Sequence, residues 1–397
     1  MSNSVRLGIV QDGPVAFDGE NYWNSHPMGH YLERICAEFG RINLYAPVVT
    51  KDSAFYETFH EVQLDSDLIH VNPLRVGGGN IFSALWRQIK QIPLYWRNLA
   101  KNDWVLFFLP ATFAFPGILV RQLQKLPYAL YFGSDWEEIA PFEFRWKRWR
   151  FLLPTYLNIG KQLQNRAIRE ASFCLTAGFA LKNKIARQGK PCFATVPRIN
   201  LSLKELFFRP DTCLHQEVVC LFVGSLIPRK GLDCLLASIG LLREWGLPAR
   251  LCIVGDGPLR STLETQVKEQ NLAGIVDLVG HIPNGPQLWQ QYRESDIFVL
   301  PTRSEGFPRV LYEAMSQSLP IVTTNVSGIP YVMEHRRNAL LVAPDETKSI
   351  ANAITELMQT PALRQKLIIE GIKTVSEILR ADPGEQLKSL VCAQSHK

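Results

Sequence analysis

The sequence predicts an α/β protein with two doubly wound, Rossmann-like domains that face each other across a cleft. Three observations support this fold class. Short apolar runs alternate with helical segments, a second alternation begins near residue 218, and 397 residues are too many for one ordinary core. We expect domains at 1–205 and 206–375, followed by a tail at 376–397. Our hypothesis is that this tail packs on the first domain.

The first half begins with a strand, a long loop and a helix. The apolar run Val5–Val10 predicts the strand, Met28–Phe39 the helix, and Ile42–Ala46 the next strand. The connection between the first strand and the helix is long for a βα loop, which favours a functional role for it. Five further strands are expected, separated by helical segments, at Leu68–Val71, Trp104–Leu109, Tyr128–Phe132, Phe173–Thr176 and Phe193–Val196.

The second half repeats the alternation after a connection near Arg198–Pro210. Its strands are expected at Val218–Val223, Arg250–Val254, Ile275–Val279, Ile297–Leu300, Ile321–Thr324 and Ala339–Val342. The helices between them are expected at Gly231–Glu244, Pro258–Gln270, Gly285–Arg293 and Pro308–Gln317. The tail from Glu346 to Val391 is predicted to be mostly helical.

Composition describes a globular protein of a reducing compartment. Hydrophobic residues make up 46% and charged residues 20% of the chain, which excludes disordered and fibrous classes. The eight cysteines form no C-x-x-C pair and no Cys/His ligand spacing, which favours free thiols. The chain starts with MSNSVRLGIV, which leads directly into a strand rather than a signal peptide. We therefore expect a cytoplasmic protein, with a peripheral position at the inner membrane face as an option.

The uncharged stretch Trp104–Val120 is the one candidate for a membrane span. It is shorter than the roughly 20 residues that a spanning helix needs, and Pro110 and Pro116 interrupt it. A buried strand, a turn and the start of a helix explain it better.

Positive charge and aromatic residues gather in the first half, which has a net charge of +7 over residues 1–205 within a total of +6. Leu85–Lys101 and Phe144–Leu152 each combine several bases with tryptophan and contain no acid. Such basic, aromatic helices suit an anionic membrane interface or an anionic acceptor. The alternative is a helix with its aromatics in the core and its bases in water. Nucleic acid is not expected as a partner, because no binding motif is present.

The strongest functional signal lies in Asp296–Gly328, which predicts a β-α-β unit. Glu305 follows the first strand and Glu313 lies within the helix. Open α/β sheets bind ligands at the carboxyl ends of their strands, so two carboxylates placed here could hold two parts of an elongated ligand. The alternative is two solvated charges.

A second signal is the segment GSLIPRKG, which follows the first strand of the second domain. Gly224 allows close backbone approach, Gly231 opens a helix, and Arg229 and Lys230 add positive charge. The segment is a plausible cradle for a diphosphate, although it is not a Walker A loop. A plain basic surface turn is the alternative.

Five stretches occur in an order and spacing that resembles a known family: VGSLIPRKG, IVGDGP, LVGHIP, DIFVLPTRSEGFPRVLYEAM and SGIPYV. They are similar to the retaining, nucleotide-sugar-dependent glycosyltransferases of family 4 (group 1 glycosyltransferases), which have the GT-B architecture. The match covers most of Val218–Pro344. The first half resembles the family only in its βα alternation, as expected if it binds a variable acceptor.

The resemblance implies a role for each matching residue. Glu305 contacts and positions the donor sugar, Glu313 binds the ribose hydroxyls, and Lys230 neutralises the departing diphosphate. Glu305 and Lys230 are therefore the expected catalytic residues. The other donor-binding residues are expected at Gly224, Ser225, Arg229, His281, Ile282, Gly306, Phe307, Pro308, Arg309 and Val310.

No metal ion or other cofactor is expected beyond the nucleotide-diphosphate sugar as co-substrate, because the GT-B pattern needs no divalent cation. The D-x-D triplet Asp65-Ser66-Asp67 lies among several acids of the first domain and is discounted.

The sequence also departs from the family pattern. Ser225 stands where relatives often have an arginine, so either Arg229 substitutes for it or donor affinity is lower. Ser318 replaces a common glycine and Tyr331 a common acid. Phe132 falls near the position of a family histidine in the first domain. Four residues are therefore candidates on the acceptor or sugar side: Gly13, His30, Ser134 and Asp135.

The expected activity is retaining transfer of a sugar to a hydroxyl of a saccharide or lipid-linked acceptor, by an enzyme of the hexosyltransferase type in polysaccharide biosynthesis. Electrostatic stabilisation of the leaving diphosphate, rather than a protein nucleophile, carries the rate. Two alternatives stay open: a non-catalytic nucleotide-sugar-binding protein, and another GT-B enzyme such as an epimerase or phosphorylase.

Overall fold

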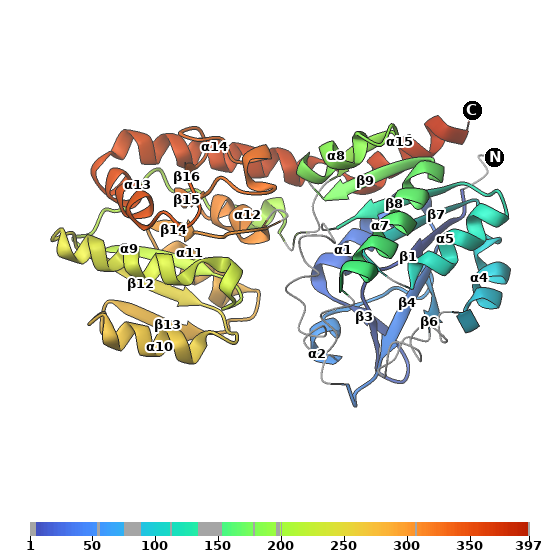
Figure 1. Cartoon of the computed structure of the whole chain (residues 1–397), viewed down its shortest axis with the longest axis horizontal. Coiled ribbons are helices and arrows are strands. Elements are labelled where there is room, and N and C mark those ends of the chain that lie inside the picture. The colour runs from blue at the N-terminus through green and yellow to red at the C-terminus, as the bar shows by residue number, and fades with distance from the viewer. Residues whose placement is uncertain are drawn as a thin grey trace. The chain divides into compact units, whose positions relative to one another are not determined.

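The computed structural model describes residues 5–53, 56–74, 89–111, 113–133, 153–177, 179–195, 199, 201–305 and 308–395. The chain forms two compact units, one of residues 1–200 with 382–397 and one of residues 201–381. Figure 1 shows both units, each with its own sheet and helices. The expected boundaries at 205 and 375 lie a few residues from these divisions.

The first unit is built on a sheet that has ten strands among the described residues. The strands follow the order β10-β9-β8-β7-β1-β4-β2-β3-β5, with β6 paired to β4. Their bounds are β1 Leu7–Val10, β2 Val15–Phe17, β3 Tyr22–Asn24, β4 Ile42–Val49, β5 Val62–Gln63, β6 Ile69–Leu74, β7 Trp104–Leu109, β8 Tyr128–Phe132, β9 Phe173–Ala177 and β10 Cys192–Thr195. Pairing is parallel except where β3 meets β2 and β5.

Helices cover both faces of this sheet. Their bounds are α1 His26–Phe39, α2 Tyr56–Phe59, α4 Ile92–Leu99, α5 Ala114–Leu123, α7 Leu153–Glu170, α8 Phe179–Ala186 and α15 Pro383–Ser395. Successive strand side chains enter two separate cores: Phe108 packs with residues of α1 and α15, and Phe107 with residues of α4, α5 and α7. Because both faces are covered, the central strands β1, β7 and β8 are continuously apolar.

The C-terminal helix α15 packs on α1 of the first unit. Asp382 accepts a hydrogen bond from Arg34 at 3.1 Å, and Lys388 lies 3.2 Å from Glu38. Leu387 and Val391 enter the core beneath α1.

The prediction of a loop between β1 and α1 is wrong in one respect, because this segment contains the strands β2 and β3. These strands have three residues each and alternate little, so hydrophobic patterning does not reveal them. The Asp18 carboxylate closes the turn between them by accepting the N–H groups of Glu20 and Asn21, each at 2.8 Å.

Within the uncharged stretch Trp104–Val120, residues 104–109 form β7 and residues 114–120 lie in α5, as predicted. In the part of the chain that the structure describes, no helix is long and apolar enough to cross a membrane. Of the two basic, aromatic stretches, Phe144–Leu152 lies outside the described residues, and so do positions 85–88 of the other.

The second unit is built on a parallel sheet. Among the described residues this sheet has six strands, in the order β13-β12-β11-β14-β15-β16. Their bounds are β11 Val218–Val223, β12 Ala249–Val254, β13 Val276–Gly280, β14 Ile297–Leu300, β15 Ile321–Thr324 and β16 Leu340–Val342. The chain passes outward from β11 to β13, then returns to place β14 on the other side of β11. Strand order therefore reverses between β11 and β14, where doubly wound sheets open a crevice at the carboxyl ends of their strands.

The helices of this unit pack on the two faces of the sheet, with α9 against α13 and α12 against α14. Their bounds are α9 Leu232–Glu244, α10 Arg260–Glu269, α11 Pro286–Glu294, α12 Arg309–Ser316, α13 Thr347–Gln359 and α14 Pro361–Arg380, with short 3₁₀ turns at Leu203–Glu205, Pro228–Lys230 and Ile329–Tyr331.

The connecting segment near residue 207 is bound to the end of α12. Ser318 has a φ of 59°, a conformation that favours glycine. Its hydroxyl donates to the Phe207 carbonyl at 2.7 Å and accepts the Arg209 N–H at 3.1 Å. These two bonds give a physical reason for serine at a position where the resemblance implies a common glycine.

Candidate functional site

Two loops meet at the switch point of the second sheet. One follows β11 and covers residues 224–231, and the other follows the neighbouring strand β14 and covers residues 301–305. The carbonyl of Arg229 accepts the Arg303 N–H at 2.7 Å and the Thr302 hydroxyl at 3.1 Å. A third loop joins from β15, where the Gly328 N–H donates to the Glu305 carbonyl at 3.3 Å.

Glycine is required where the first loop enters α9. Gly231 has φ 68° and ψ 28°, in the left-handed region. A β-carbon at this position would collide with the Pro301 carbonyl oxygen. The close approach that glycine permits brings the neighbouring Lys230 against the β14 loop.

Lys230 and Glu305, which the sequence places 75 residues apart, form an ion pair. The Lys230 Nζ lies 2.7 Å from Glu305 Oε1, and its side chain is 8% exposed. The Arg229 guanidinium donates to Glu305 Oε2 and to the Ser304 carbonyl. Two cations thus share one carboxylate, which leaves an excess of positive charge that suits an anion.

Burial lowers the pKa of the Lys230 ammonium to about 7, and the positive charges of Arg229 and Arg309 act in the same direction. The Glu305 carboxylate opposes this shift because it stabilises the ammonium form. An additional anion at this position would favour the charged lysine further.

Glu313 is held by an aromatic residue that the sequence did not single out. Tyr292, buried in the last turn of α11, donates its hydroxyl to Glu313 Oε2 at 2.7 Å. The Tyr292 ring stacks on Phe298 of β14, with centroids 5.8 Å apart. Burial raises the pKa of Glu313, while the Tyr292 hydroxyl and the charge of Arg309 oppose the rise. In the sequence, Tyr292 is indistinguishable from an ordinary core aromatic on an amphipathic helix.

The other predicted donor-site residues lie after β11, after β13 or at the start of α12. Gly224 is partly buried, Ser225 exposed, His281 exposed, Ile282 partly buried, Pro308 buried, Arg309 exposed and Val310 partly buried. Gly306 and Phe307 lie outside the described residues. The structure thus joins Arg229, Lys230 and Glu305 by direct contacts.

The four candidates on the acceptor or sugar side belong to the first unit, and the described residues do not bring them together in one site. Gly13 is partly buried between β1 and β2, and its carbonyl accepts the Gln11 side-chain amide at 2.9 Å. His30 is exposed on α1, with its Nδ1 2.9 Å from Glu33. Ser134 and Asp135 lie outside the described residues.

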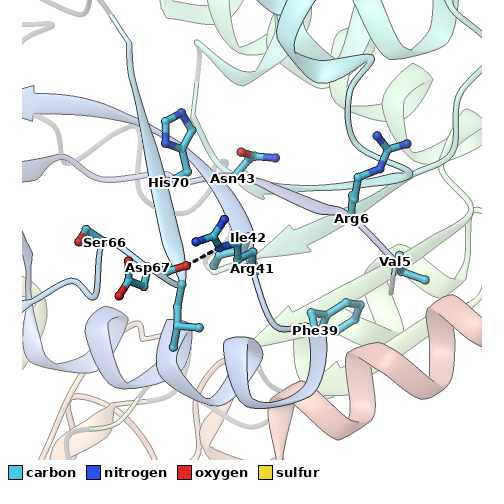
Figure 2. A pocket seen from close by; sticks show the side chains of 10 residues that line it. Val5, Arg6, Phe39, Arg41, Ile42, Asn43, Ser66, Asp67 and His70 are labelled. Atoms are coloured by element: carbon cyan, nitrogen blue, oxygen red, sulfur yellow. Dashed lines mark hydrogen bonds between the residues drawn. The ribbon is translucent and has the colours of Figure 1, made fainter. Parts of the chain in front are cut away.

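The first unit has a hollow of about 500 Å³ at the amino ends of β1, β4 and β6. Figure 2 shows Arg6, Arg41 and His70 among its lining, with the Arg41 guanidinium bonded to the Asp67 carbonyl at 2.7 Å. Ligands of doubly wound sheets bind at the opposite edge, so this hollow is not the candidate site. Ser66 and Asp67 of the D-x-D triplet are among its lining residues. Among the described residues, no group of three or more His, Cys, Asp or Glu side chains could hold a metal ion.

Comparison with known proteins agrees with the fold and finds a family match in the second unit. Residues 206–374 match the family "Glycosyl transferases group 1". The amylovoran biosynthesis glycosyltransferase AmsK of Erwinia amylovora is 29% identical over 188 residues, which are 46% of this chain and 46% of that protein. The chain thus aligns with about half the length of such curated relatives.

Solved structures match the chain over nearly its whole length. Sucrose-phosphate synthase from Thermosynechococcus elongatus superposes with a TM-score of 0.71 and 17% identity, covering 98% of both chains. HepE from Anabaena, solved with UDP, gives a TM-score of 0.68 and 14% identity, covering 98% of this chain and 99% of that one.

These findings show the fold of the protein and a family match within its second unit. The chain has the GT-B fold, with two Rossmann-like units, as the sequence predicted. Residues 206–374 of the chain, which match the group 1 glycosyltransferase family, include Lys230, Glu305 and Glu313.

Proposed function

We propose that this protein is a retaining glycosyltransferase that moves a sugar from a nucleotide-diphosphate donor to a hydroxyl acceptor. The observation that carries the proposal is the meeting of Arg229, Lys230 and Glu305 at the switch point of the group 1 domain. Two cations beside one carboxylate, partly buried at the carboxyl edge of the sheet, suit an elongated anionic ligand.

Donor binding divides between the two loops and α12. The diphosphate lies against Arg229 and Lys230, with no metal ion between them, because the cations supply the neutralising charge. Glu313 accepts hydrogen bonds from the ribose diol through the carboxylate that Tyr292 orients. Glu305 contacts the sugar and exchanges part of its contact with Lys230 for the incoming phosphate.

The reaction breaks the bond between the anomeric carbon and the diphosphate oxygen and forms a bond to the acceptor oxygen on the same face. The acceptor proton leaves to a phosphate oxygen. Negative charge builds on the diphosphate as its bond breaks, and the ammonium of Lys230 stabilises that charge. No protein nucleophile takes part in this scheme.

We further propose that the acceptor is a saccharide or a lipid-linked saccharide of polysaccharide biosynthesis, used at the cytoplasmic membrane surface. Support comes from the surface formed by α4 and α5, which lie side by side in Figure 1 and are joined by the hydrogen bond from the Gln124 side chain to the Trp96 carbonyl at 2.9 Å. Residues 89–101 and 113–133 contain no acid. The exposed apolar side chains of this surface are Ile89, Leu94, Trp96, Leu119 and Leu123, and its exposed bases include Arg97, Lys101 and Lys125.

Exposed tryptophan and leucine beside bases fit an anionic lipid interface. Sedimentation with vesicles containing phosphatidylglycerol tests this surface. Binding is expected to weaken in Trp96→Ala and with added salt, and to persist in Trp245→Ala, an exposed tryptophan of the second unit. Equal binding of both variants would refute the assignment of this surface.

The transfer proposal is tested with labelled UDP-, GDP- and ADP-sugars and a membrane lipid and saccharide extract. Label should move from one donor to an extract component, and the product should keep the donor's anomeric configuration by NMR. An inverted product would overturn the retaining mechanism. Donor binding without any transfer would favour the non-catalytic alternative, and isomerised donor would favour an epimerase.

A further inference from the structure

We infer that Arg303 is a positioning residue, which holds the Pro228–Lys230 turn in the geometry that receives the donor diphosphate. This inference rests on the proposed function, because the turn matters only if it binds the donor. Arg303 lies in the β14 loop, two residues before Glu305, and its side chain is 31% exposed.

One guanidinium reaches three segments of the second unit. Its Nη1 donates to the Pro228 carbonyl at 2.6 Å, in the turn itself. Its Nη2 donates to Asp233 in the first turn of α9 at 2.7 Å. Its Nε donates to Asp345, after β16, at 2.6 Å. The planar fork of arginine allows all three bonds at once, which a lysine cannot reproduce.

The backbone of Arg303 adds a fourth contact to the same turn. Its N–H donates to the Arg229 carbonyl at 2.7 Å. The turn is thus bound at Pro228 by the side chain and at Arg229 by the main chain. Lys230 is the next residue of the turn. Its Nζ contacts Glu305, which follows Arg303 by two residues in the β14 loop.

The charges around Arg303 indicate that it positions the turn and does not itself bind the diphosphate. Asp233 and Asp345 neutralise the guanidinium, and these two hydrogen-bonded pairs raise its pKa. Within the described part of the chain, Arg229 and Lys230 have the single carboxylate of Glu305 as their acidic partner, so they keep an excess of positive charge for an anion. Arg303 orders the turn, and its two neighbours meet the diphosphate.

Loss of the side chain has two consequences. The Pro228 carbonyl loses its guanidinium donor, so the turn gains freedom. Asp233 and Asp345 lose a positive partner, so negative charge near the diphosphate is no longer balanced. Both effects weaken donor binding, and displacement of a positioned group by about 1 Å can lower rates by roughly a hundredfold.

The experiment compares Arg303→Ala with Arg303→Lys and with Arg337→Ala as the matched control. Arg337 also pairs with two acids of the second unit, Glu334 at 2.9 Å and Glu370 at 3.1 Å, and its side-chain hydrogen bonds go to these acids rather than to the turn. We expect Arg303→Ala to raise the Kd for the nucleoside diphosphate about tenfold or more and to lower kcat/KM by roughly ten- to a hundredfold. Arg303→Lys should recover part of the affinity, and Arg337→Ala should match the wild type.

Hydrogen exchange in the free protein gives a readout that needs no ligand. The amides of residues 225–227 and 229–231 should exchange faster in Arg303→Ala than in the wild type. Their exchange should be unchanged in Arg337→Ala. Equal exchange, or a wild-type Kd in Arg303→Ala, would overturn the inference. Failure of the wild type to bind any nucleotide, with the exchange difference present, would count against the proposed function while the ordering role of Arg303 stood.

Discussion

Replacement of Lys230 by methionine removes one positive charge from the proposed diphosphate site with little change in side-chain volume. The Lys230 side chain is 8% exposed, so the methionine fills the same buried space. Glu305 keeps the Arg229 guanidinium as its partner and is not left as an unpaired buried charge. The burial that lowers the pKa of Lys230 to about 7 also makes its charge costly in the free protein. We therefore expect the free energy of unfolding to change by less than about 1.5 kcal/mol.

Catalysis should respond far more than stability. Loss of one group that stabilises developing negative charge typically lowers kcat by about 10² to 10³, or roughly 3–4 kcal/mol. The assay measures kcat and KM for sugar transfer alongside thermal unfolding, with Lys268→Met, an exposed lysine of α10, as the control. Turnover within a few-fold of the wild type in a folded Lys230→Met protein would refute the electrostatic role assigned to this lysine.

Three further predictions concern the same site. The affinity for UDP should fall as pH rises above 7, by up to about tenfold per pH unit. The reason is that Lys230 loses its proton above its pKa of about 7, whereas a bound diphosphate favours the protonated form. Titration calorimetry should show this decline in the wild type and a flatter profile in Lys230→Arg. Tyr292→Phe removes the hydroxyl bonded to Glu313, so the Kd for UDP should rise about tenfold, and a wild-type Kd would show that Glu313 needs no such partner. Gly231→Ala should lower Tm and nucleotide affinity together, since a β-carbon there meets the Pro301 carbonyl; an unchanged unfolding curve would contradict the close approach of the two loops.

Much of the second unit could be predicted because its strands are uninterrupted apolar runs. Val218–Val223 and Ile297–Leu300 are strands at the predicted bounds, and Pro308 stands at the N-cap of α12, close to the predicted helix start. The parallel alternation then implies that loops after different strands share one edge. That rule, applied to Lys230 and Glu305, explains how residues far apart in sequence come to be paired.

Other features depend on contacts that no local pattern records. The hairpin of β2 and β3 is too short for periodicity and relies on the Asp18 carboxylate to close its turn. Tyr292 gains its role only because α11 lies beside α12, so that its hydroxyl meets Glu313. Arg303 likewise depends on Asp345, a residue 42 positions away after another strand. In each case the sequence shows the residue type, and only the packed sheet shows its partner.

Thermal unfolding of the purified protein with UDP-, GDP- and ADP-sugars, and with their diphosphates, tests the central claim most directly. A ligand that binds only the folded state raises Tm, and the rise grows with the logarithm of the ligand concentration relative to Kd. The account predicts that ligands with one particular nucleotide base raise the Tm of the wild type. It also predicts that this shift is lost when Lys230→Met is combined with Glu313→Ala. A shift of equal size in that double variant, or none with any nucleotide in a folded wild-type protein, would contradict the placement of a nucleotide-sugar donor between the β11 loop and α12.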